Sequence, residues 1–218
     1  MIWKGRKVMK ILFLGDSITD AGRNRADPAS MGSGYPLLVS ARLGADRPGT
    51  FLFRNTGVSG DRSVDIYARV KKDCWNWQPG VVSLLAGIND VWHELGERNG
   101  VDAERFYRIC RMLVSDTREH LPEVRLLLME PFVLPGTSTS GDWEVFSREV
   151  PLRARAVQEI AREFHALYLP LQGIFDEACR RCPPDCWLMD GVHPTPAGHQ
   201  LIADAWLDLF RRELAALS

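Results

Sequence analysis

Five short apolar runs, separated by longer amphipathic segments, constrain the fold of this chain more than any other feature. The runs cover residues 8–14, 50–54, 81–86, 124–129 and 166–169. Each is short enough to be one strand, and successive apolar residues are typical of strands that are buried on both faces. Strands that alternate with helices predict a parallel sheet covered by helices on both sides. We therefore expect a three-layer α/β/α fold with a five-stranded parallel sheet in the flavodoxin-like order 2-1-3-4-5.

The segments between these runs contain apolar residues at helical spacing. They predict helices over residues 35–43, 61–77, 102–122, 152–164, 174–179 and 196–214. Asp61 or Ser63 is expected to cap the second of these helices, and Thr195 is expected to cap the last one, which starts at Pro196. The Gly-, Pro-, Ser- and Thr-rich segment 131–143 and the polar segment from Ser17 to Gly34 are expected to be loops.

Length and charge limit the possible partners. The chain has 218 residues, of which 45% are hydrophobic, and we expect residues 1–218 to form one domain. Its formal net charge of -1, without a stripe of Lys or Arg, argues against nucleic-acid binding. No apolar run is long enough for a signal peptide or a membrane span, so we expect a soluble cytoplasmic protein without a membrane partner.

Five cysteines are present, and three of them lie close together as Cys179, Cys182 and Cys186. An odd number of cysteines without a secretory signal favours reduced thiols. The cluster resembles half of a zinc site, but it lacks a fourth ligand at short spacing. We therefore expect no metal and no cofactor, and either a disulfide or ordinary thiols in this loop.

Chemically useful groups follow the first three expected strands. Ser17 comes just after the first strand, Gly60 after the second and Asn89 after the third. In an open parallel sheet of this order, the carboxyl ends of these strands surround the point where ligands bind. A serine in such a turn can also be a simple helix N-cap, so Ser17 alone decides nothing.

Near the other end of the chain, Asp190 and His193 complete a set suited to acyl transfer. His193 can accept the proton of the Ser17 hydroxyl, and Asp190 can hold the imidazole in the required tautomer. The amides of Ser17 and Gly60 and the side-chain amide of Asn89 can donate hydrogen bonds to the developing oxyanion. Asp16 and Asp90 adjoin this set, and we interpret both as buried acids bonded to loop amides.

Four blocks of the sequence resemble the SGNH, or GDSL-type, hydrolase superfamily. They are Gly15-Asp16-Ser17-Ile18, Asn55-Thr56-Gly57-Val58-Ser59-Gly60, Gly87-Ile88-Asn89-Asp90 and Asp190-Gly191-Val192-His193-Pro194. They occur in the order of the family and span the chain from residue 15 to the last helix. The resemblance implies a serine esterase with Ser17 as nucleophile, Asp190 as acid, His193 as base, and Ser17, Gly60 and Asn89 as oxyanion donors.

The surroundings of these blocks are similar to the intracellular branch of the superfamily that removes acetyl groups from xylo-oligosaccharides. Trp92 and Trp187 lie three residues from Asn89 and Asp190. Flat aromatic faces in a cleft suit sugar rings, so both tryptophans are candidate substrate-binding residues, although each can also pack under a loop. Asp20, Arg23 and Asn24 can either order the loop after Ser17 or touch the substrate.

The leading hypothesis is hydrolysis of short acyl esters, most simply acetyl groups on a sugar, through an acyl-enzyme on Ser17. The expected partner is thus a small acylated substrate, and the resemblance also implies assembly into homo-oligomers. One alternative is a lysophospholipase or thioesterase of the same fold that acts on longer acyl chains. An alternative of another class is a non-catalytic flavodoxin-like module that binds a ligand, but the chain has no phosphate-binding glycine motif.

Overall fold

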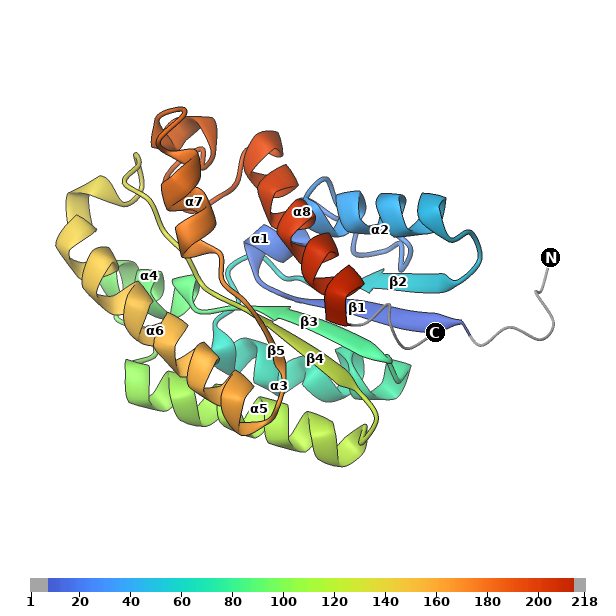
Figure 1. The fold of residues 1–218 in the computed structure, drawn as a ribbon. Helices are drawn as coiled ribbons and strands as arrows, with labels where there is room; N and C mark the ends of the chain where they lie inside the picture. The colour runs from blue at the N-terminus through green and yellow to red at the C-terminus, as the bar shows by residue number, and fades with distance from the viewer. Residues whose placement is uncertain (1–7, 214–218) are drawn as a thin grey trace.

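A parallel five-stranded sheet in the order β2-β1-β3-β4-β5 forms the centre of the computed structural model, which describes residues 8–213 (Figure 1). This sheet confirms the expected α/β fold and strand order. The strands are β1 (Met9–Gly15), β2 (Phe51–Asn55), β3 (Val81–Leu85), β4 (Arg125–Met129) and β5 (Leu167–Leu169). Because all strands are parallel, the segments that leave β1, β2 and β3 begin at the same edge of the sheet.

Helices cover both faces of this sheet (Figure 1). One face packs against α2 (Tyr35–Asp46), α7 (Gln172–Ala178) and α8 (Pro196–Glu213). The other packs against α3 (Ser63–Asp73), α5 (Ala103–His120) and the second half of α6 (Trp143–Glu163). Two further helices, α1 (Ser17–Asp20) and α4 (Ile88–Glu97), follow β1 and β3. Within residues 8–213, no helix has the length and apolar character needed to cross a membrane.

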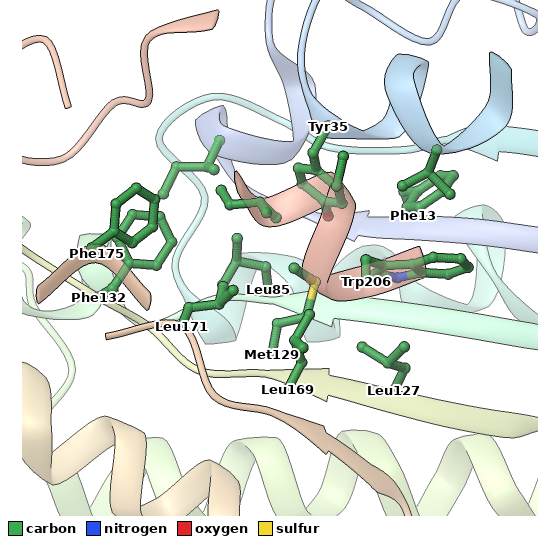
Figure 2. Close-up of a cluster of buried hydrophobic side chains, with 14 of the residues drawn as sticks. Phe13, Tyr35, Leu85, Leu127, Met129, Phe132, Leu169, Leu171, Phe175 and Trp206 are labelled. Carbon is green, nitrogen blue, oxygen red and sulfur yellow. The ribbon is translucent and has the colours of Figure 1, made fainter. Parts of the chain in front are cut away.

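Trp206 fixes the last helix to the middle of the sheet. Its ring is fully buried, stacks on Phe210 and lies 5.7 Å from the ring of Phe13 on β1 (Figure 2). Its Nε1 donates a hydrogen bond to the Ser83 hydroxyl of β3 at 3.0 Å. Burying an aromatic ring of this size and pairing its N–H stabilises the contact of α8 with β1 and β3. The segment that carries His193 immediately precedes α8 and is therefore held near the carboxyl ends of these strands.

Two helices differ from the expectation. The helix expected from residue 152 begins at Trp143, so Pro151 lies inside α6. Proline removes one helical hydrogen bond, but the neighbouring Val150 and Ala154 are buried in the structure, and their packing supports the helix on both sides of it. The helix α4 was not among the expected helices; its N-cap is Gly87, which has a positive φ of 128°.

Helix ends also differ. Arg62, not Asp61 or Ser63, is the N-cap of α3, and a separate 3₁₀ turn (Trp75–Trp77) follows the end of α3 at Asp73. The segment after Ser17 begins with the short helix α1 rather than with a loop. The capping role expected of Thr195 is confirmed, because its hydroxyl accepts a hydrogen bond from the Gly198 amide at 3.1 Å. The expected end of the last helix at residue 214 lies outside the described residues.

Cys182 and Cys186 form a disulfide, which is one of the two alternatives expected for this loop; the general expectation of reduced thiols does not hold for this pair. The 3₁₀ turn Pro184–Cys186 folds the loop back and brings the two Cα atoms to 6.1 Å, within the range that a disulfide spans. The remaining cysteines are free thiols, and Cys74 and Cys110 are buried. Among residues 8–213, no three His, Cys, Asp or Glu side chains are grouped so that they could hold a metal ion.

Candidate active site

Ser17 is the first residue of α1, directly after the turn that ends β1. The N-cap is Asp16, whose Oδ1 accepts a hydrogen bond from the Ile18 amide at 3.0 Å. The interpretation of Ser17 as the cap is therefore wrong, and its hydroxyl does not serve the helix terminus. The turn requires glycine at position 15, because a Cβ there would lie 2.4 Å from the Thr19 hydroxyl and 2.5 Å from the Leu85 carbonyl oxygen.

The fold brings this hydroxyl and the imidazole of His193 together. Ser17 Oγ lies 3.0 Å from His193 Nε2, and His193 Nδ1 lies 2.8 Å from Asp190 Oδ2. Asp190 Oδ1 accepts hydrogen bonds from the amides of Val192 and His193, at 2.9 and 2.8 Å. Burial disfavours ionisation of Asp190, but these bonds outweigh it and hold the pKa of Asp190 below its ordinary value. An ionised Asp190 accepts a hydrogen bond from Nδ1–H, so Nε2 is the unprotonated nitrogen and can accept the proton of Ser17.

The loop after β4 holds the backbone of Asp190 and Gly191 through hydrogen bonds, a role that the sequence did not indicate. The Ser138 amide donates to the Asp190 carbonyl oxygen at 2.9 Å, and the Leu134 amide donates to the Gly191 carbonyl oxygen at 2.9 Å. Gly191 has a φ of +100°, and a Cβ at this position would meet the Thr139 hydroxyl at 2.4 Å. Segment 131–143 thus packs against the turn from Asp190 to His193 and holds it in position.

The three expected oxyanion donors lie on segments that leave neighbouring strands. Ser17 follows β1, Gly60 follows β2 with a φ of +86°, and Asn89 is on the first turn of α4 after β3. The Asn89 side-chain amide donates to the Asp61 carbonyl oxygen at 3.0 Å, next to Gly60. In the part of the chain that the structure describes, the amides of Ser17 and Gly60 donate to no protein acceptor. Both N–H groups are therefore available to a ligand oxygen.

Asp90 ties the same loop to α4. Its carboxylate accepts hydrogen bonds from the Ser63 amide, at 3.1 Å to each oxygen, and from the Ser63 hydroxyl at 2.5 Å. Burial raises the pKa of Asp90 to about 6, against the opposing effect of these bonds. This arrangement agrees with the interpretation of Asp90 as a buried acid bonded to a loop amide. Asn89, which binds Asp61, and Asp90, which binds Ser63, together hold residues 61–63 against α4.

The two tryptophans have different surroundings. The Trp92 ring lies 5.9 Å from the ring of His193 and packs edge-on against Phe146, which places it beside the hydrogen-bonded set. The Trp187 Nε1 donates to the Cys182 carbonyl oxygen at 3.1 Å, and the guanidinium of Arg181 lies over its ring. Substrate contact remains a prediction for both residues, and the contacts of Trp187 agree with the alternative of packing within its own loop.

An open cleft of about 740 Å³ lies beside Ser17 and His193. Its lining includes Arg23, Arg25, Ser59 and Met189. The sequence leaves open whether Asp20, Arg23 and Asn24 order the loop or touch substrate, and it assigns no individual role to Arg25, Ser59 or Met189. The lining residues come from the loop after α1, the loop after β2 and the segment before α8, so no single stretch of sequence indicates their proximity.

Comparison with known proteins identifies the family. A model of the GDSL-like lipase/acylhydrolase family matches residues 13–201. The chain belongs to this family. It is accordingly a carboxylic ester hydrolase of the SGNH/GDSL type. An acetylxylan esterase of Geobacillus stearothermophilus is 33% identical over 208 residues, which cover 91% of this chain and 92% of that protein.

Solved structures of family members have the same fold. A Parabacteroides merdae protein assigned as a GDSL-like lipase superimposes with a TM-score of 0.90 at 33% identity, covering 94% of this chain and 96% of its own. The crystal structure of the Geobacillus acetylxylan esterase gives a TM-score of 0.83 at 31% identity, with 94% of both chains covered. Two catalytic mutants of that esterase carry alanine in place of a serine and of an aspartate.

Proposed function

We propose that this GDSL-family esterase removes short acyl groups, in particular acetyl groups from xylo-oligosaccharides or related sugars, through an acyl-enzyme on Ser17. The observation that carries the proposal is the continuous hydrogen-bonded path from Ser17 Oγ through His193 to Asp190. It lies at the sheet edge where the amides of Ser17 and Gly60 have no internal acceptor among residues 8–213. The similarity to an acetylxylan esterase supports the acetylated sugar as substrate.

The geometry supports a two-step reaction. In the first step, Ser17 Oγ attacks the ester carbonyl carbon while its proton moves to His193 Nε2. The oxyanion that forms faces the amides of Ser17 and Gly60 and the side chain of Asn89, each donor being worth on the order of 3 kcal/mol. His193 then donates the proton to the oxygen of the leaving alcohol, and the ester bond breaks.

In the second step, water attacks the acyl-enzyme. His193 Nε2 accepts the proton of the water, and the tetrahedral intermediate again faces the same donors. The bond between the acyl carbon and Ser17 Oγ then breaks, and the proton returns to Ser17 as acetate leaves. Asp190 stays ionised throughout and stabilises the positive charge on the imidazole in both steps.

Replacing Ser17 by alanine tests this mechanism. Ser17→Ala should lose hydrolysis of an aryl acetate and of acetylated xylo-oligosaccharides, with an unchanged far-UV spectrum and melting temperature. Ser147→Ala is the matched control, because Ser147 lies exposed on α6 and bonds only to the Glu144 carbonyl oxygen of its own helix. An active Ser17→Ala protein would refute the acyl-enzyme.

A series of acyl chain lengths tests the acyl group. The proposal expects kcat/KM to fall steeply beyond a few carbons on esters of one common alcohol. A rate that stays level or rises towards long chains would refute the acetyl preference and would support a lysophospholipase or thioesterase instead.

A further inference from the structure

Arg23 lies on a hydrogen-bonded loop and lines the cleft beside Ser17. Its amide donates to the carbonyl oxygen of Asp20 at 3.0 Å and to Asp20 Oδ1 at 3.1 Å. Its Nε donates to the Gly57 carbonyl oxygen at 2.8 Å, which fixes the plane of the guanidinium. Within residues 8–213, neither terminal nitrogen of Arg23 has a protein partner, and both remain accessible in the cleft. The two terminal nitrogens of this guanidinium are therefore available to donate hydrogen bonds to a ligand.

The nearest carboxylate does not neutralise this group. Asp20, which is nearly buried, is already bonded to the Arg25 guanidinium at 2.8 Å and to the Ser59 amide at 3.1 Å. Burial lowers the pKa of Arg23, and the neighbouring cations Arg25 and Arg69 lower it further against the pull of Asp20. Arg25 and Asp20 thus balance one another, while Arg23 is a half-buried cation without an ion-pair partner in the described part of the chain.

This part of the cleft has room for the alcohol part of the substrate. An acetyl group fills only a small fraction of about 740 Å³, so most of the cleft is available to the larger leaving alcohol. A planar guanidinium with two free terminal nitrogens matches a carboxylate in a bidentate pair. A singly charged carboxylate also matches the single charge of one guanidinium, whereas a phosphate dianion would bring a second negative charge close to Asp20.

We propose that Arg23 is a specificity-determining residue that binds a carboxylate on the alcohol part of the substrate. The preferred substrates are then acetyl esters of oligosaccharides that carry an acidic sugar, such as a uronic acid. The inference rests on the esterase function proposed for the same cleft. It adds that the preferred substrate carries a negative charge on its alcohol part.

Two small acetates that differ mainly in charge test the proposal without depending on a sugar. They are para-acetoxybenzoate, which carries a carboxylate, and para-acetoxybenzamide, which is neutral. In the wild-type protein, kcat/KM for the benzoate should fall with added salt, while that for the benzamide should not. In Arg23→Gln, the ratio of the two kcat/KM values, benzoate over benzamide, should fall by about tenfold, as expected for loss of a charge-assisted pair.

Comparing ratios separates binding from folding. If Arg23→Gln only disturbs the loop at Gly57, both substrates lose rate together and the ratio stays constant, which would overturn the proposal. Arg23→Lys keeps the charge and should keep part of the preference. Arg42→Gln, on the exposed side of α2 and paired with Asp46, is the matched control and should leave the ratio unchanged.

Acetylated xylo-oligosaccharides with and without a uronic acid branch then test the substrate class. The branched esters should have the lower KM in the wild-type protein, and Arg23→Gln should remove this difference. Equal KM values in the wild-type protein would overturn the assignment. Failure of the esterase function itself has a different outcome, because the wild-type protein would then hydrolyse neither small acetate.

Discussion

The buried carboxyl group of Asp16 should make the stability of this protein depend strongly on pH. Its Oδ1 caps α1, but its Oδ2 is buried and has no hydrogen-bond partner. Burial raises the pKa of Asp16 to about 7; the bond from the Ile18 amide opposes this effect, and the nearby charges of Asp90 and Asp61 add to it. The Tyr35 hydroxyl, on the side of α2, is the other titratable group that interacts with this carboxyl.

The sign and the size of the effect follow from this shift. The carboxyl group ionises near 3.8 in the unfolded chain but only near 7 in the folded protein. Between these values the folded state holds a proton that the unfolded state has lost, so the free energy of unfolding decreases as pH rises. At about 1.4 kcal/mol per pKa unit, the contribution of Asp16 amounts to about 4 kcal/mol once the pH exceeds 7.

Asp16→Asn should remove this dependence while keeping the cap. The asparagine oxygen can still accept the Ile18 amide, whereas its NH₂ group takes the place of the unpartnered Oδ2 at a cost of about 1–3 kcal/mol at every pH. The wild-type protein loses stability between pH 5 and pH 8, because the folded protein gives up its proton only near pH 7. The free energy of unfolding of Asp16→Asn should therefore rise by about 3 kcal/mol relative to that of the wild-type protein over this range.

Urea unfolding at pH 5, 6, 7, 8 and 9 measures this difference directly. Asp102→Asn is the matched control, because Asp102 is also an N-cap, of α5, and its carboxylate accepts the Arg105 amide at 2.9 Å. Asp102 is exposed, and its bonds lower its pKa instead of raising it, so its variant should not gain stability at high pH. A difference between Asp16→Asn and the wild-type protein that is the same at pH 5 and pH 9 would refute the reasoning.

Two further predictions concern the ends of the Asp190-to-α8 segment. In Asp190→Asn, the side-chain NH₂ group would donate to His193 Nδ1 and leave the imidazole proton on Nε2, which then cannot accept the proton of Ser17. In steady-state assays, kcat for an aryl acetate should therefore fall on the order of 10⁴-fold while the fold persists. A loss below tenfold would contradict the role of Asp190. Thr195→Ala should lower the free energy of urea unfolding by about 1 kcal/mol, because the Gly198 amide loses its acceptor; an unchanged midpoint would show that this cap contributes nothing.

The sheet and the positions of the candidate site residues could be predicted because both depend on local patterns. Short apolar runs identified all five strands, and the motifs after the first three strands placed Ser17, Gly60 and Asn89 at one edge. Helix boundaries were less predictable, because tertiary packing decided them. In α6, buried Val150 and Ala154 carry the helix through Pro151, and no local rule for proline indicates this.

Several contacts that hold the site together could not be predicted, because the residues that make them lie outside the motifs. Arg69 is an example: its position on α3 is typical of a solvated charge, yet its Nη2 donates to the Gly15 carbonyl oxygen at 3.0 Å and its Nη1 to the Thr56 carbonyl oxygen at 2.7 Å. It also pairs with Asp61 at 2.6 Å, and the Asp61 carbonyl oxygen in turn holds the Asn89 side chain.

One side chain on α3 therefore links the segments that carry Ser17, Gly60 and Asn89. Sequence motifs name the groups that can react, because acyl transfer requires particular functional groups at the ends of particular strands. The distances between those groups depend on residues such as Arg69 and Ser138. Other side chains could hold the same backbone groups, so no fixed sequence motif marks these positions. A chain could keep every motif and still lose its esterase activity if these linking contacts were replaced.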